Sequence, residues 1–229
     1  MTEGAWFRFI LVVFCSLIGL PDSPVVAAGA SAPVPKEIQQ LYDKKDYQKT
    51  IEALSKLDPE RVAAPDVRRL KVRTLLKLGK PKEALEEYDK LEASLQRDDL
   101  PLLRELALGF IVVMMKDMRE QMRGAAYTAL KEFDSDEAVP YFEDGLSDGS
   151  GPVRVLAVEG LGRSEAGRRS VKLRSAIEDQ AGMVKARVVK VLGRSGDPSG
   201  LPLVEAATKD ELNTVRIAAY AALVRLGRK

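Results

Sequence analysis

The chain has 229 residues, of which 45% are hydrophobic and 31% charged, and a formal net charge of +2. Such a chain can form one large or two small folded domains, and its balanced charge argues against a general attraction to nucleic acid. It contains no His, and Cys15 is its single Cys, so it lacks the commonest general base and metal ligand and has one thiol at most. We therefore expect a protein without catalytic activity, cofactor or metal.

Residues 1–28 have the pattern of an export signal. A short polar start with Arg8 precedes the apolar run FILVVFCSLIGL at residues 9–20, and prolines and small residues follow. This run is shorter than the roughly 20 residues that span a bilayer. We predict cleavage near Ala28 and a periplasmic or secreted protein, which contains no thiol once Cys15 is removed. Retention of the segment as a membrane anchor is the alternative.

The second half of the chain repeats an amphipathic segment with a 31-residue period. The first segments begin at Met122, Val153, Val184 and Val215. Second segments lie between them and end at Asp148, Asp179 and Asp210. Apolar residues recur at helical spacing within each segment, and Gly- and Pro-containing turns separate them. One such pair buries one face only, so the pairs are expected to stack into a solenoid.

The pattern VRxxAxxALG followed by GDPxxLPxL resembles the short HEAT-like repeats of the phycobilisome-lyase type, over residues 118–229. The resemblance implies a solenoid of antiparallel helix pairs, a fold that serves many unrelated proteins. It also raises one enzymatic alternative, a bilin lyase-like enzyme or lyase subunit. The export pattern and the lack of His argue against that alternative, as does the absence of a recognisable nucleophile.

A second period lies upstream, where LYDKKDYQKTIEALSKLD and LLKLGKPKEALEEYDKLE stand 34 residues apart. The later copy has Gly79, Ala84 and Tyr88 where tetratricopeptide (TPR) repeats need a turn and a small-to-large contact. The region resembles TPR repeats, and the apolar residues 100–116 are expected to form a closing helix. Asp117 and Glu120 suggest a capping box for the next helix. We thus predict an all-α solenoid with TPR-like repeats at 29–116 and HEAT-like repeats at 117–229.

Charged residues recur in register with the 31-residue repeat. Three acid–base pairs are six residues apart: Asp148 with Arg154, Asp179 with Lys185, and Asp210 with Arg216. In repeats of this kind such a ladder ties one repeat to the next, so we interpret it as structural, with an anion-binding stripe as the alternative. A second column, Arg163, Arg194 and Arg225, lies at expected helix C-termini. There it complements the helix dipole, although one such edge is also suited to an acidic partner.

The basic run at residues 68–82 contains a candidate binding site. The resemblance to TPR modules implies that Arg69 and Arg73, one turn apart, face a groove and clamp a carboxylate of a partner protein, either its C-terminus or an acidic segment. Tyr42 and Phe110 are expected to add apolar contacts. The alternatives are a solvated helix pair, neutralised by the acidic helix that follows, and a membrane-surface adaptor.

The last expected helix, residues 214–226, is apolar on nearly every side. Ala221 and Ala218 stand where earlier copies have charged residues, and Leu223 adds to the same edge. We expect this edge either to associate with another chain, including a second copy, or to tuck against the preceding pair. Taken together, the sequence predicts an exported, non-catalytic scaffold that binds a protein partner and no nucleic acid.

Overall fold

The computed structural model of the chain describes residues 33–133 and 136–227. The chain divides into two units, residues 1–31 and 32–229, and every described helix belongs to the second unit. The predicted export signal, its cleavage site near Ala28 and Cys15 lie outside the described residues. Among the described helices, none has the length and apolar character needed to cross a membrane.

Helices form the whole of the regular secondary structure in the described residues. The first group is α2 (Lys36–Asp43), α3 (Tyr47–Ser55), α4 (Pro59–Ala63), α5 (Pro65–Lys77), α6 (Pro81–Leu95) and α7 (Leu100–Met114). The second group is α8 (Glu120–Leu130), α9 (Val139–Gly145), α10 (Gly151–Leu161), α11 (Glu165–Arg168), α12 (Val171–Ser175), α13 (Gly182–Ser195), α14 (Leu201–Ala207) and α15 (Asn213–Leu226). Short 3₁₀ turns lie at Lys131–Phe133, Asp136–Ala138, Ala176–Glu178 and Pro198–Gly200.

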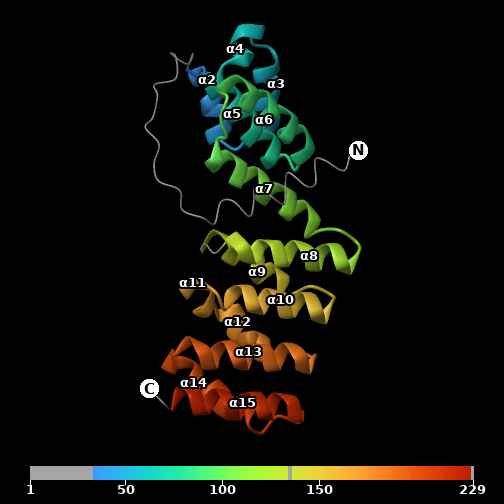
Figure 1. Cartoon of the computed structure of the whole chain (residues 1–229), viewed down its shortest axis with the longest axis vertical. Coiled ribbons are helices and arrows are strands. Elements are labelled where there is room, and N and C mark those ends of the chain that lie inside the picture. The colour runs from blue at the N-terminus through green and yellow to red at the C-terminus, as the bar shows by residue number, and fades with distance from the viewer. Residues whose placement is uncertain (1–32, 134–135, 228–229) are drawn as a thin grey trace. The chain divides into compact units, whose positions relative to one another are not determined.

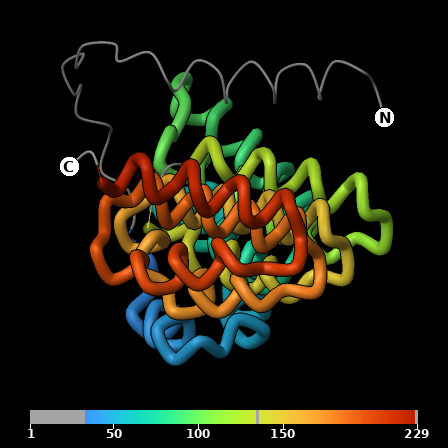
Figure 2. Tube along the Cα trace, turned by 90° about the horizontal axis from the view of Figure 1, so that it is seen from below, coloured from blue at the N-terminus to red at the C-terminus, as the bar shows by residue number. Residues whose placement is uncertain are grey.

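The long helices of the second group lie one above the next. Figure 1 shows α8, α10, α13 and α15 stacked in this order, with the shorter helices between them. Seen from the α15 end in Figure 2, the traces of successive pairs superimpose in projection. The all-α solenoid of stacked helix pairs predicted from the 31-residue period is therefore confirmed.

The stack has one continuous apolar core because the same repeat position is apolar in successive copies. Val153, Val184 and Val215 hold the same place in successive repeats and are each at most 1% exposed. Glycine brings neighbouring helices close: a Cβ on Gly193 of α13 would collide with the Cβ of Ala222 of α15. Close approach of the first helices thus depends on small residues at their contacts.

The first group repeats a turn at the 34-residue spacing. Lys45 has φ 61° and Gly79 has φ 72°, and the two residues are 34 positions apart. In both turns the backbone N–H of this residue donates to the carbonyl three residues earlier, which belongs to Tyr42 in one turn and to Leu76 in the other. The same left-handed turn therefore joins α2 to α3 and α5 to α6.

The predicted capping box at the start of the next helix is wrong. Helix α8 begins at Glu120 and has Arg119 as its N-cap residue, with no side-chain cap. The carboxylate of Asp117 instead accepts hydrogen bonds from the backbone N–H and the guanidinium of Arg119, at 2.8 and 2.9 Å. Asp117 lies three residues before the helix, and both of its carboxylate oxygens accept hydrogen bonds from Arg119, so they do not cap α8.

Candidate protein-interaction site

The predicted clamp arginines of α5 are both occupied by carboxylates of the same chain. Nε of Arg69 lies 2.7 Å from Asp99 and its Nη1 lies 2.8 Å from Asp66. Arg73 makes a two-point ion pair with Glu105 at 2.9 and 3.0 Å. The two arginines therefore fasten α5 to the start of α7, and a partner carboxylate would have to displace Glu105 or Asp99.

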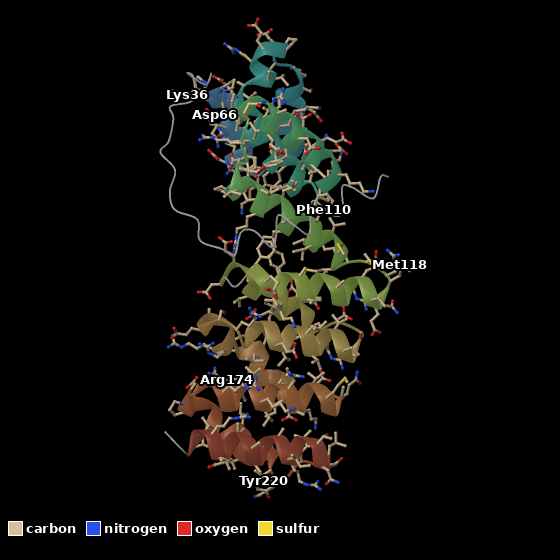
Figure 3. The ribbon with its side chains drawn as sticks, in the orientation of Figure 1. Lys36, Asp66, Phe110, Met118, Arg174 and Tyr220 are labelled. Carbon is tan, nitrogen blue, oxygen red and sulfur yellow. The ribbon has the colours of Figure 1, made fainter. Side chains whose placement is uncertain are left out.

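The two aromatic residues predicted beside the clamp lie in different core clusters. Tyr42 packs with Ile38 and Leu54, and its ring meets that of Tyr47 edge-on at 5.4 Å. Burial raises the pKa of the Tyr42 hydroxyl, with a further rise from Tyr47. Phe110 of α7, labelled in Figure 3, is partly buried against a separate cluster. Both rings are half-buried against the core. Tyr42 also lies near Arg73, whose positive charge partly offsets the rise in the pKa of the Tyr42 hydroxyl.

The ladder residues of the HEAT-like region form a repeated network. Arg154 is 6% exposed and makes a two-point ion pair with Asp179, at 2.7 and 2.8 Å. Its Nη1 also donates to the backbone carbonyl of Asp148 at 2.8 Å. Asp179 in turn accepts from the backbone N–H of Ala181 at 2.7 Å, just before α13. One arginine thus holds the loops on both sides of its own helix pair.

The same arrangement occurs in neighbouring repeats, but the cation or the groups that it binds differ from one repeat to the next. Arg123 pairs with Asp148 at 2.7 and 2.9 Å, and Lys185 pairs with Asp210 at 3.0 Å. Arg216 donates to the carbonyls of Asp210 and Glu211 and to the side chain of Asn213. Each paired cation therefore binds the carboxylate of the next ladder Asp along the chain, while the preceding ladder Asp offers Arg154 and Arg216 its backbone carbonyl.

These contacts lower the pKa of the ladder aspartates. Burial raises the pKa of Asp179, but hydrogen bonds from Arg154 and from the backbone N–H of Ala181 lower it more, so that the pKa lies below its usual value. Asp148 shows the same net lowering, with Arg123 and the N–H of Ser150 as donors. Each ladder aspartate is paired with a cation of the same chain, which favours the structural interpretation over an anion-binding stripe.

A basic cleft of about 280 Å³ lies where α8, α10 and α13 end. Its lining comes from three successive repeats: Lys131, Glu159, Gly162, Arg163, Arg187, Lys190, Val191 and Arg194. Five of these residues are cations and one is a carboxylate. A Cβ on Gly162 would lie 2.9 Å from a methyl of Val191, so this glycine lets α10 and α13 approach beneath the cleft.

The cations of the basic cleft fall into two classes. Glu159 bridges Lys131 and Arg187, at 2.8 Å from each. The side chains of the other three, Arg163, Lys190 and Arg194, are exposed. Within residues 33–133 and 136–227 no ion pair or hydrogen bond engages these three side chains. They are the cations that remain available to a ligand.

The sequence indicated only part of this cleft. Arg163 and Arg194 were visible as a column with a 31-residue spacing, whereas Lys131, Arg187 and Lys190 were not assigned to it. The i, i+4 spacing of Lys190 and Arg194 in one helix was a usable signal. The third member of the column, Arg225, lies in the last turn of α15 and does not line the cleft.

Of the three residues predicted at the association edge of α15, Ala218, Ala221 and Leu223, only Ala221 is exposed. Ala218 is 3% exposed, and Leu223 packs against the core, because these residues face the preceding helix pair. The large exposed apolar residues are Ile217 at 68%, Tyr220 at 59% and Val224 at 55%. We name these three residues the α15 stripe.

The described residues contain no cluster of acidic or sulfur side chains able to hold a metal ion. Val139 and Gly145 also occupy positions where a calcium loop starting at residue 134 would require Gly and Glu.

Comparison with known families gives a match to HEAT repeats over residues 170–229, which include α12 to α15. The chain contains HEAT-like repeats. The match agrees with the resemblance at this level and says nothing of the phycobilisome-lyase type or of the TPR-like region. A search of curated proteins gives no match.

Solved structures with a similar fold include human deoxyhypusine hydroxylase in complex with glycerol, at 21% identity and a TM-score of 0.47, over 84% of this chain and 77% of that one. Another is a designed armadillo repeat protein in complex with the peptide (KR)4, at 14% identity and a TM-score of 0.41, over 98% and 92% of the two chains. Likenesses at these values carry no functional conclusion.

Proposed function

We propose that this chain is an exported, non-catalytic scaffold that binds a partner protein at the basic cleft of its HEAT-like repeats. The observation that carries the proposal is the presence of three unpaired, exposed cations around one cleft. The pair of Arg154 and Asp179 ties the same repeats together at the beginnings of α10 and α13, at the opposite ends of these helices from the cleft. A repeat solenoid of this kind offers surface rather than an enclosed pocket.

The remaining parts of the chain are assigned accordingly. We assign residues 29–116 as TPR-like repeats, supported by the left-handed turns at Lys45 and Gly79. The arginines Arg69 and Arg73 act as fasteners within that region rather than as the partner-binding clamp. The lack of His in the sequence supports a non-catalytic role. Export rests on the signal pattern alone, and N-terminal sequencing of the secreted protein tests cleavage near Ala28.

Site-specific photo-crosslinking in living cells tests the proposed binding surface. Thr128 is exposed and occupies in α8 the position of Glu159 in α10 and of Lys190 in α13, by the 31-residue spacing. A photoreactive residue at position 128 should therefore capture the partner beside the basic cleft. The matched control is the same residue at Val171, an exposed position on α12.

A discrete protein adduct from position 128 and none from position 171 supports the proposal. Equal adducts from both positions, or none from either while the protein is folded and exported, contradict a partner at this surface.

A further inference from the structure

Helix dipoles explain some cations of the basic cleft and leave others unexplained. Arg163 follows the end of α10, and Arg194 lies in the last turn of α13, where a cation meets the unpaired carbonyls of a helix end. Arg187 and Lys190 lie further back in α13, which runs from Gly182 to Ser195. The dipole effect fades within the last turn, so it does not explain why cations occupy these two positions.

The carboxylates of the chain itself also do not neutralise the positive charge of the basic cleft. Glu159 is the single carboxylate of the lining, and it is shared by Lys131 and Arg187. Arg187 keeps 36% of its side chain exposed in this pair. Five cations against one carboxylate leave a strong local excess of positive charge, in a chain whose formal net charge is only +2.

The arrangement of the unpaired cations favours a ligand with several separate negative groups. Lys190 and Arg194 lie one turn apart on α13, and Arg163 approaches from the neighbouring repeat. Arg163 and Arg194 hold the same place in successive repeats. An extended or helical segment with repeated carboxylates offers a separate negative group to each of the three cations.

The surroundings argue for a protein ligand over a phosphate backbone. The cleft is confined to about 280 Å³ and has Val191 and Gly162 in its lining. Nucleic acid and anionic membranes are recognised by long basic stripes or large patches. In α15 the position equivalent to Lys190 is Ala221, so the α13 cation has no counterpart there. The basic surface is therefore local.

We infer that the basic cleft recognises a Glu- or Asp-rich segment of the partner protein, with Arg163, Lys190 and Arg194 as the residues that contact its carboxylates. This inference rests on the proposed function and names the chemistry of its partner. On the scaffold side, binding uses two guanidinium groups and one ammonium group. The chain contains no His, so the interaction is independent of pH from about 5 to 8 and weakens below about 4.3, where Glu of the ligand becomes protonated.

The test measures fluorescence anisotropy of a labelled, Glu-rich peptide with the full chain. The cleft variant carries Arg163→Gln, Lys190→Gln and Arg194→Gln. The matched control carries Lys56→Gln, Lys82→Gln and Lys209→Gln, three exposed lysines outside the cleft, so both variants lose the same net charge. We expect the peptide to bind wild type and control alike and the cleft variant at least about tenfold more weakly, since three ion pairs are removed together.

Other outcomes overturn the inference. A control that weakens binding as much as the cleft variant would show attraction by net charge alone. Tighter, cleft-dependent binding of a single-stranded oligonucleotide or of phosphatidylserine vesicles would assign the cleft to phosphate ligands. An absence of peptide binding by the wild type refutes the carboxylate ligand, and an adduct from position 128 would then leave the proposed scaffold function standing.

Discussion

Arg154 reaches across its own repeat to Asp179, where its guanidinium faces the carboxylate in a two-point ion pair of 2.7 and 2.8 Å. Their side chains are 7% and 10% exposed. Because the same guanidinium also holds the carbonyl of Asp148, it joins the loops that precede two successive repeats. The pair is the most buried member of the ladder and should be its strongest link.

Replacing Asp179 by Ala should destabilise the protein by about 3 kcal/mol, because a buried arginine is left without its partner. Asp210→Ala should cost less, since its partner Lys185 is 23% exposed and can be solvated. Urea unfolding followed by far-UV circular dichroism measures both. Equal losses in the two variants would show that burial does not set the strength of the ladder.

Acid should weaken the same link. The pKa of Asp179 is lowered in the folded chain, so its contribution to stability is complete above about 3.8, the ordinary value, and disappears as the pH falls through the folded pKa. The free energy of unfolding of the wild type should therefore exceed that of Asp179→Asn by a constant amount from pH 7 to about 5. This difference should shrink between about pH 4 and 2. A difference that stays constant throughout would exclude the carboxylate as its source.

Gly193→Ala should destabilise the stack by about 1 to 3 kcal/mol through overpacking. The added methyl would lie 2.8 Å from the Cα of Ala222, and backbone cannot swing aside as a flexible side chain can. This cost outweighs the roughly 1 kcal/mol that alanine gains over glycine within a helix. Gly149→Ala is the control, because no atom lies within 4 Å of a Cβ there. Thermal unfolding of both variants distinguishes the close helix contact from a general effect of an added methyl.

The two equivalent turns of the N-terminal group should respond differently to substitution. Gly79 has φ 72°, so Gly79→Ala should destabilise by about 1 to 2 kcal/mol through a left-handed Ala. Lys45 already adopts φ 61°, and Lys45→Gly should relieve that cost and leave stability unchanged or slightly higher. Denaturant midpoints measure both changes. A loss of stability in Lys45→Gly would mean that its side chain contributes more than its backbone costs.

The sequence predicted the fold correctly where a single repeat period applied to many residues. The repetition of Val153, Val184 and Val215 at 31-residue spacing indicated that one face is buried in every repeat, and the structure confirms this burial. It also indicated that Asp179 belongs to a ladder. The partner of its side chain could not be read from spacing. The helix pair that contains both residues folds back on itself and pairs Asp179 with Arg154, 25 residues earlier, and not with Lys185, six residues later.

The site was harder to predict, because its ion pairs join residues that are far apart in the sequence. The clamp at Arg69 and Arg73 followed from helical spacing, but the return of the chain in α7 places Asp99 and Glu105 against these arginines. The basic cleft was missed for the converse reason. Its residues Lys131 and Lys190 become neighbours only when successive repeats stack, and no local pattern shows which cations then remain without a carboxylate.

The α15 stripe should mediate weak association with a second copy. The residues one repeat earlier than Ile217, Tyr220 and Val224, at a spacing of 31, are Ala186, Val189 and Gly193. They lie in α13 and are buried, and Gly193 lies against α15.

In α15 this face is open, and Figure 3 shows Tyr220 at the end of the stack, on the side of α15 away from α13. We expect dimers in the micromolar range or weaker, because one helix face is smaller than the roughly 800 Å² that each partner buries in a standard interface. Sedimentation velocity across a wide concentration range should detect them. Tyr220→Glu should keep the protein monomeric, while Val171→Glu, a change at a residue 74% exposed on α12, should leave dimerisation intact. A wild type that remains monomeric at every concentration would show that the stripe does not pair with itself.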